Sequence, residues 1–203
     1  MINVVNIVMG IISMLIGMIG AVLTYKSYLK ERALKNISWD DINSGTKFLY
    51  KKLHKLNFEP DFFISPHPKA GIIAYLLSQF YDYDIFSDVG YTVIDNPTFA
   101  NPYIEENYTF VSTNRCKVFL SKIIQDMPNK ENKKIVIVND FILSGDFNSK
   151  ITDMLISYGY SKENIIVCCI AITKVAISSA KAPDFYWKIV DDGDFYFPWG
   201  KAE

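Results

Sequence analysis

The first 25 residues differ from the rest of the chain, because they contain no acidic, basic or histidine residue. Residues 2–23 are apolar except for Asn3, Asn6 and Ser13. As a helix, a segment of about 22 residues rises about 30 Å, which matches the hydrocarbon thickness of a bilayer. The pattern predicts a transmembrane helix, and the alternative is a buried helix of a soluble protein.

Basic residues follow this apolar segment, whereas a cleaved signal peptide carries them before its apolar core. They are Lys26, Lys30, Arg32 and Lys35. By the positive-inside rule, this order predicts an uncleaved single-pass membrane anchor with its N-terminus outside and the following domain in the cytoplasm.

Small residues recur at every fourth position of the apolar segment, at Ser13, Gly17 and Ala21. Such a stripe allows two helices to approach closely in a membrane, which predicts a homodimer through the anchor helix. The alternative is that these residues reflect only the ordinary composition of membrane helices.

The rest of the chain alternates between helical and strand patterns. Ser38 followed by Asp41 is typical of a helix N-terminus, and the apolar spacing after it predicts an amphipathic helix. Three continuous apolar runs, at residues 61–65, 134–138 and 164–172, have the pattern of parallel strands that are buried on both faces. The first two runs are each followed by a turn and a helical pattern, so we expect an α/β fold with an open, mostly parallel sheet and helices on both faces.

These patterns divide the chain into three regions. Residues 1–25 form the predicted transmembrane anchor, and residues 26–58 form a juxtamembrane segment with the amphipathic helix. Residues 59–203 form the α/β domain. Within that domain, residues 95–107 contain two prolines and little periodicity, which predicts a long loop of the kind that often serves as a lid.

Composition excludes several classes of function. The 21 Lys and Arg residues nearly balance the 22 Asp and Glu residues, so we expect no nucleic-acid partner. No HExxH, CxxC or GxSxG motif is present, which argues against the usual zinc and serine hydrolases. Cys168 and Cys169 are neighbours on a predicted strand and must face opposite ways, so together with Cys116 they are expected to be reduced thiols of the core.

The segment after the second predicted strand carries the candidate chemistry. Ligands of open parallel sheets bind beyond the carboxyl ends of the strands, where helix N-termini point their free amides. Residues 139–148 occupy such a place, with a carboxylate at Asp140 and the pair Ser144 and Gly145 before a helix. The amides and the Ser144 hydroxyl can hold a phosphate while Asp140 contacts sugar hydroxyls or a metal, and the alternative is a tight turn with a helix cap.

This segment, IVIVNDFILSGDF, resembles the phosphoribosyl pyrophosphate signature of type I phosphoribosyltransferases. That signature is an apolar strand, two acids, two apolar residues, two Thr or Ser, Gly, any residue, and Thr or Ser. Asp140, Ser144 and Gly145 match it, whereas Asn139 stands at the first acid and Phe147 replaces the last hydroxyl. The resemblance implies ribose contacts from Asn139 and Asp140. It also implies a phosphate site made by Ser144, Gly145, Asp146, Phe147 and Asn148.

The segment ISPHPKAGIIAYLL resembles the pyrophosphate loop of the same family, an apolar strand that ends in a basic residue and a glycine before a helix. Lys69 and Gly71 match that loop, which also contains His67 and Ala70. Arg115 and Lys117, which follow a predicted strand at residues 108–113, are further candidates for phosphate contact.

The C-terminal segment resembles the tail of xanthine/guanine phosphoribosyltransferases. Lys174 falls where a strand-end lysine of that family binds the purine 6-oxo group. Phe195 falls where an aromatic residue stacks on the base, and Pro198 and Trp199 follow it as in the family pattern. The resemblance therefore implies base contacts from Lys174 and Phe195.

Together these resemblances imply an enzyme that joins ribose 5-phosphate to a purine base and releases pyrophosphate. Asp140 and Lys69 would be the catalytic residues, and Mg²⁺ would be carried by the substrate rather than by protein ligands. The departures at Asn139, Leu143, Asp146 and Phe147 remove a carboxylate and hydroxyls, and they add a negative charge beside the phosphate site.

Three hypotheses follow. The first is a membrane-anchored phosphoribosyltransferase-like protein that binds phosphoribosyl pyrophosphate or a purine nucleotide and acts on a purine. The second is a non-catalytic nucleotide sensor or effector, in signalling or defence, which reports ligand binding through its anchor. The third is a membrane adaptor whose α/β domain binds protein.

Overall fold

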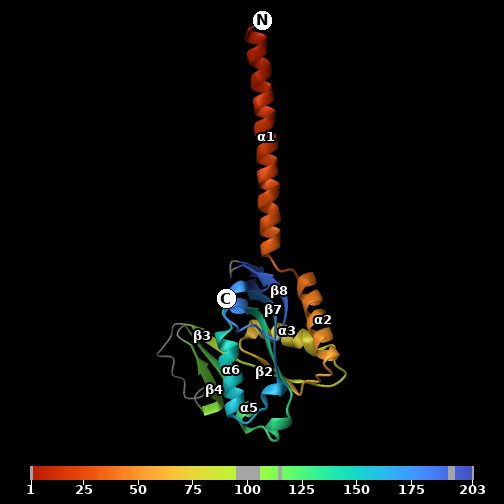
Figure 1. The fold of residues 1–203 in the computed structure, drawn as a ribbon, viewed down its shortest axis with the longest axis vertical. Coiled ribbons are helices and arrows are strands. Elements are labelled where there is room, and N and C mark those ends of the chain that lie inside the picture. Colours follow the sequence, from red (N-terminus) through yellow and green to blue (C-terminus); the bar gives the residue numbers. More distant parts are fainter. Residues whose placement is uncertain (1, 95–105, 114–115, 192–194, 203) are drawn as a thin grey trace.

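The computed structural model describes residues 2–94, 106–113, 116–191 and 195–202. Arg115 and most of the predicted lid at 95–107 lie outside these ranges. Figure 1 shows a long N-terminal helix that projects from a body of mixed helices and strands.

The body is built on a five-stranded sheet in which every neighbouring pair of strands is parallel. Its order is β2 (Phe86–Val89), β1 (Phe62–Ser65), β6 (Ile135–Ile142), β7 (Ile165–Thr173) and β8 (Phe185–Val190). All residues of β1, β6 and β7 are buried, because both faces of the sheet are covered. The parallel α/β fold expected from the three apolar runs is confirmed.

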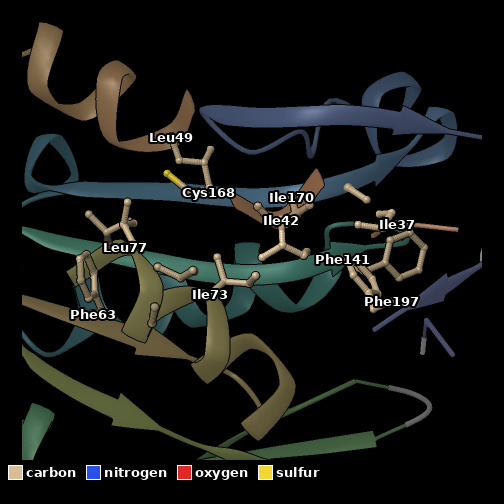
Figure 2. Close-up of a cluster of buried hydrophobic side chains, with 14 of the residues drawn as sticks. Ile37, Ile42, Leu49, Phe63, Ile73, Leu77, Phe141, Cys168, Ile170 and Phe197 are labelled. Atoms are coloured by element: carbon tan, nitrogen blue, oxygen red, sulfur yellow. The ribbon is translucent and has the colours of Figure 1, made fainter. Parts of the chain in front are cut away.

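Helices cover both faces of this sheet. On one face, α2 (Trp39–Lys55) and α3 (Pro68–Ser78) pack in a cluster that contains Ile42, Ile73 and Cys168 (Figure 2). On the other face, α6 (Asp146–Ser157), α5 (Ile123–Asp126) and α7 (Lys174–Ser178) pack in a second cluster that contains Cys169. The two adjacent cysteines therefore face opposite clusters, as predicted, and burial raises the pKa of both thiols.

The predicted start of the amphipathic helix α2 is confirmed by a capping box. The Asp41 amide donates to the Ser38 hydroxyl at 3.1 Å, and the Ser38 amide donates to the Asp41 carboxylate at 2.9 Å. The buried positions of the helix include Ile42, Leu49 and Leu53, which keep the predicted helical spacing.

A three-stranded antiparallel sheet lies beside the main sheet, in the order β3 (Tyr91–Ile94), β5 (Cys116–Ser121) and β4 (Tyr108–Ser112). The buried Asp88 carboxylate on β2 accepts from the Ser121 amide at 3.0 Å and so joins the two sheets. Burial raises the pKa of Asp88 above its ordinary value. Strand β4 was expected from the sequence, whereas this second sheet was not.

The remaining short elements are two 3₁₀ turns and a tail hairpin. The turns are η1 (Lys130–Asn132) and η2 (Lys162–Asn164). We use the name tail hairpin for residues 195–202, in which β9 (Tyr196–Phe197) pairs with β10 (Gly200–Lys201) in an antiparallel arrangement.

The N-terminal helix α1 (Ile2–Lys35) is 34 residues long. Its segment Met9–Ser27 is long and apolar enough to cross a membrane, and none of that segment is buried by the rest of the protein. Large apolar side chains such as Met14, Ile16 and Leu23 are more than half exposed. Within this chain, the described side chains of the segment therefore have no apolar partner.

Candidate functional site

At one place in the main sheet, the chain leaves two neighbouring strands in opposite directions. From β1 the chain moves to β2 on one side, and from β6 it moves to β7 on the other side, although β1 and β6 are neighbours. In open α/β sheets, ligands bind at the carboxyl ends of such a pair of strands. The loops after β1 and β6 are the two that the sequence analysis selected.

Asp140, near the end of β6, is the point where three distant segments meet. One carboxylate oxygen, Oδ1, accepts from the Phe141 amide at 2.8 Å and lies 3.2 Å from Nε2 of His67. The other oxygen, Oδ2, accepts from the indole N–H of Trp199 at 3.1 Å. The side chain is only 4% exposed. The structure therefore brings together the β1 loop, the β6 end and the tail hairpin.

His67 connects this carboxylate to helix α3. It is the N-cap residue of α3, and its Nδ1 accepts from the Ala70 amide at 3.3 Å. Because Nδ1 acts as the acceptor, the ring proton lies on Nε2 and is donated to Asp140. The predicted pyrophosphate loop thus adopts a capped helix start that faces the carboxylate.

Lys69 and Gly71 lie in the first turn of α3. The Lys69 ammonium donates to the Lys201 carbonyl of the tail hairpin at 3.3 Å. A Cβ at position 71 would lie 3.2 Å from the methyl groups of Val89, so glycine allows the helix to pack closely on β2.

The loop after β6 forms the turn that opens α6. The Ser144 hydroxyl donates to the Asp146 carboxylate at 2.9 Å and accepts from the Asp146 amide at 3.4 Å. Gly145 has a φ of +78°, a left-handed conformation that favours glycine. Among the hydrogen bonds of the described residues, the amides of Gly145, Phe147 and Asn148 have no acceptor.

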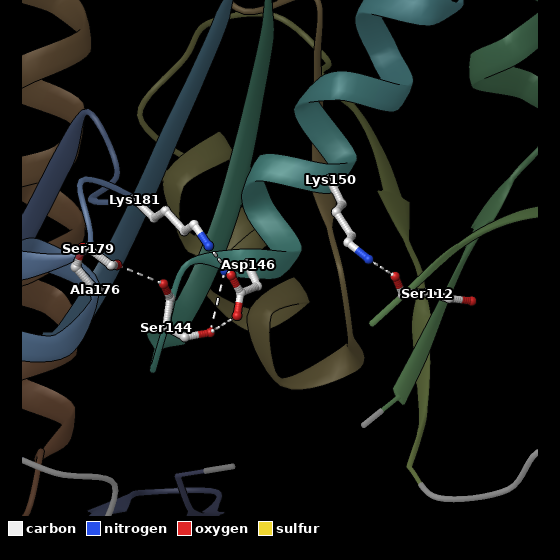
Figure 3. Close-up of polar contacts among 7 residues, drawn as sticks. All are labelled: Ser112, Ser144, Asp146, Lys150, Ala176, Ser179 and Lys181. Carbon is white, nitrogen blue, oxygen red and sulfur yellow. Dashed lines mark hydrogen bonds and ion pairs between the residues drawn. The ribbon is translucent and has the colours of Figure 1, made fainter. Parts of the chain in front are cut away.

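Lys181 is a member of this site that the sequence analysis missed. Its ammonium pairs with the Asp146 carboxylate, and both side chains are partly exposed (Figure 3). The hydrogen bonds from Lys181 and Ser144 lower the pKa of Asp146. No local pattern could have revealed this pair, because the two residues are 35 positions apart.

The backbone after α7 holds Lys181 in place. Its amide donates to the Ala176 carbonyl at 3.2 Å, and the preceding Ala180 adopts a left-handed φ of +56°. This is a Schellman motif with alanine where glycine is usual, so the backbone carries a small strain beside the loop.

Asn139 points away from Asp140. Its amide nitrogen donates to the Asn148 side-chain oxygen at 2.8 Å, and both residues are buried on the α6 side of the sheet. Successive strand residues face opposite sides of a sheet, which explains why Asn139 and Asp140 do not share partners. The expected ribose pair is therefore divided between two faces, and Asn139 and Asn148 are bonded to each other.

The two predicted base contacts differ in exposure. The Lys174 ammonium, at the start of α7, is 2.5 Å from the Asp191 carboxylate, which raises the pKa of Lys174. Phe195 is 3% exposed, and its ring packs at 5.0 Å against Phe141 in an edge-on geometry. A base can stack on Phe195 only if the tail hairpin first moves, so this contact stays a prediction.

Lys117 lies on β5 of the antiparallel sheet, with its ammonium 5.2 Å from the centre of the Phe110 ring. Its phosphate contact stays a prediction. Among the described residues, no group of three or more His, Cys, Asp or Glu side chains can hold a metal ion. The predicted Mg²⁺ is one that a substrate would carry.

No protein-family model and no curated protein matches the sequence. Among solved structures, a purine phosphoribosyltransferase from Pyrococcus horikoshii is similar, with 19% identity and a TM-score of 0.57 over 82% of this chain and 95% of that one. The chain has a phosphoribosyltransferase-like fold.

Two further structures share this phosphoribosyltransferase-like fold. The xanthine-guanine-hypoxanthine phosphoribosyltransferase of Helicobacter pylori has 14% identity and a TM-score of 0.55, over 81% of this chain and 92% of that one. A protein from Neisseria gonorrhoeae solved with bound ppGpp has 16% identity and a TM-score of 0.55, over 81% of this chain and 89% of that one. At these identities the likeness establishes the fold.

Proposed function

We propose that this protein is a membrane-anchored, phosphoribosyltransferase-like protein that binds phosphoribosyl pyrophosphate or a purine nucleotide. The proposed site lies at the carboxyl ends of β1 and β6. The observation that carries the proposal is the convergence of His67, Asp140 and Trp199 at this switch point. These residues come from the three segments that resemble the phosphoribosyltransferase motifs.

The α6 turn supplies the proposed phosphate contacts. Three amides without acceptors, those of Gly145, Phe147 and Asn148, lie at the positive end of the helix dipole. Lys181 adds a cation beside them. A phosphate that enters this turn would replace Asp146 as the partner of Lys181, and the Ser144 hydroxyl would turn toward it.

Binding without transfer is the function that the contacts favour. Both carboxylate oxygens of Asp140 already accept hydrogen bonds, and Asn139 is bonded to Asn148 instead of facing the ribose. Asp146 also places a negative charge at the phosphate turn. We therefore infer a sensor or effector that reports a bound nucleotide through its anchor.

Transfer of phosphoribose to a purine base is the second candidate. It is favoured by Lys69, which lies in the first turn of α3 shortly after His67, the residue that contacts the Asp140 carboxylate. Substitution at the anomeric carbon develops positive charge on the ribose and negative charge on the pyrophosphate. Asp140 would stabilise the first charge, and Lys69 would stabilise the second together with substrate-bound Mg²⁺.

The proposed anchor is α1, with the N-terminus outside and the domain in the cytoplasm. Its exposed apolar segment Met9–Ser27 is followed by the basic residues of the helix end. Accessibility labelling of single cysteines placed at residues 2 and 55 in intact cells tests this orientation. Labelling of residue 55 from outside would contradict it.

Calorimetry on the full chain in lipid discs tests the proposed function. Phosphoribosyl pyrophosphate with Mg²⁺, GMP and ppGpp are titrated separately, and pyrophosphate release is then measured with guanine, hypoxanthine and xanthine. We expect binding without release. Release would establish transfer, and the absence of binding by every ligand would contradict the proposal and favour a protein-binding adaptor.

Two variants complete that experiment. Asp140→Ala should abolish any pyrophosphate release and weaken ligand binding. Asp153→Ala, an exposed carboxylate on α6, is the matched control and should leave both unchanged. Unchanged ligand binding in Asp140→Ala would remove that residue from the site.

A further inference from the structure

The tail hairpin occupies the candidate site at two points. The Trp199 indole donates to the Asp140 carboxylate at 3.1 Å, and the Lys201 carbonyl accepts from the Lys69 ammonium at 3.3 Å. Asp140 and Lys69 are the groups that the proposed function assigns to the ribose and the pyrophosphate. A ligand that contacts both groups must therefore displace the hairpin.

The same hairpin is bonded to the two residues that directly follow the anchor helix. The Ile37 amide donates to the Tyr196 carbonyl at 2.8 Å, and Asn36 forms a parallel bridge with Tyr196. Because α1 ends at Lys35, these contacts begin at the first residue after the helix. One short element thus contacts both the candidate site and the base of α1.

Packing makes the hairpin a single unit. The Phe197 ring stacks on Trp199, with centres 5.0 Å apart and planes 5° apart, and the Ala202 amide donates to the Phe195 carbonyl at 3.0 Å. Figure 2 shows Phe197 beside Phe141, with Ile37 close by, and all three belong to one buried cluster. Closely packed side chains shift together rather than one at a time.

We infer that the tail hairpin is an autoinhibitory element that couples occupancy of the site to the base of the anchor helix. The identity of the ligand rests on the proposed function, whereas the coupling rests on the contacts of the hairpin. A phosphoribosyl ligand competes with Trp199 for Asp140 and with Lys201 for Lys69. Loss of these contacts loosens the pairing of Tyr196 with Asn36 and Ile37.

This coupling is reciprocal. Suppose that ligand binding weakens the pairing of Tyr196 with residues 36 and 37 by a given factor. A movement of α1 that breaks this pairing must then change ligand affinity by the same factor. Movement of the anchor helix therefore changes ligand affinity, just as ligand binding changes the contacts at the base of the helix.

Amide hydrogen exchange on the full chain in lipid discs tests the coupling without any ligand. Trp199→Phe keeps an aromatic ring and removes only the indole donor to Asp140. We expect exchange to rise about tenfold at residues 195–202 and also at residues 36–42, because a hydrogen bond to a charged group contributes roughly one such factor or more. Tyr196→Phe is the matched control, since the pairing uses its backbone, and it should change neither segment.

Increased exchange of the hairpin alone, with residues 36–42 unchanged, would overturn the coupling. If Trp199→Phe does not fold, Asp140→Asn provides the second test, because it weakens the same hydrogen bond from the other side. Exchange should again rise both at residues 195–202 and at residues 36–42. A rise in only one of these segments would overturn the coupling.

A ligand experiment separates this inference from the proposed function. Addition of phosphoribosyl pyrophosphate and Mg²⁺ to the unaltered protein should raise exchange in both segments. Calorimetric binding without that rise would overturn the autoinhibition and leave the proposed function intact. Absence of binding would contradict the proposed function, and the ligand-free variants would still decide the coupling.

Discussion

Gly145 lies directly against the backbone of Lys181, so that a Cβ at position 145 would be 2.3 Å from the Lys181 carbonyl oxygen. The Lys181 backbone cannot move away easily, because it is held by the turn after α7. The contact fixes the separation between the α6 turn and the cation that faces Asp146.

Gly145→Ala should therefore destabilise the protein strongly. Gly159 has a φ of +100° and no atom near the position of a Cβ, so Gly159→Ala measures the cost of the backbone conformation alone. We expect about 1 kcal/mol for Gly159→Ala and about 1 to 3 kcal/mol more for Gly145→Ala, which adds a steric clash. Urea unfolding measures both, and equal losses would contradict the close contact.

Asp146→Asn should tighten the binding of phosphate-containing ligands. It removes a negative charge from the α6 turn and frees Lys181 from its ion pair. We expect a gain of about fivefold to tenfold in affinity, consistent with one charge interaction in partly exposed surroundings. Calorimetry with phosphoribosyl pyrophosphate checks it, with Asp153→Asn as control, and weaker binding would show that the phosphate enters elsewhere.

The double variant Asp146→Thr, Phe147→Thr extends this test, because it removes the same charge and places a hydroxyl at position 147, where the family signature ends in Thr or Ser. Phosphate affinity should rise further than in Asp146→Asn. No further gain would show that Phe147 does not face the ligand.

His67 has two structural partners, and two variants separate them. His67→Asn keeps an acceptor for the Ala70 amide at the start of α3, whereas His67→Ala loses both the cap and the donor to Asp140. We expect His67→Ala to lose about 1 kcal/mol more than His67→Asn in the free energy of unfolding, since that is the usual contribution of a helix cap. Identical losses would mean that the cap contributes nothing.

The buried carboxylate of Asp88 should make the free energy of unfolding depend on pH. Burial raises its pKa in the folded state above the unfolded value of 3.8, so its protonation favours the folded state. This contribution is fully present below pH 3.8 and is lost as pH rises through the raised folded pKa. Asp88→Asn keeps an acceptor for the Ser121 amide, and it should remove this decline from unfolding curves measured against pH. An unaltered decline would assign it to another group.

Much of the fold could be predicted from local patterns. The apolar runs specify β1, β6 and β7, because a strand covered on both faces needs an apolar side chain at nearly every position. Cys168 and Cys169 illustrate this, since their opposite orientations follow from the strand alone. In the antiparallel sheet, β4 pairs with the next strand, β5, with Ser112 opposite Lys117. The pairing of β3 with β5 is the part that no local period specifies, because β4 lies between these two strands in the sequence.

The candidate site was predictable only where a motif is continuous. Asp140 and His67 were identified from such motifs, and the structure joins them. Lys181 and Trp199 reach the site through tertiary contacts, from a turn after α7 and from the tail hairpin. Phe195 illustrates the limit, because its sequence position suits a base contact while its ring packs against Phe141.

The uninterrupted helix α1 has a mechanical consequence. Between the apolar segment that ends at Ser27 and the helix end at Lys35, the helix continues for about 12 Å at the usual rise per residue. Asn36 pairs with Tyr196 directly after the helix, so no loop separates the apolar segment from the body. A tilt or axial rotation of the proposed membrane anchor would therefore displace the hairpin that covers Asp140.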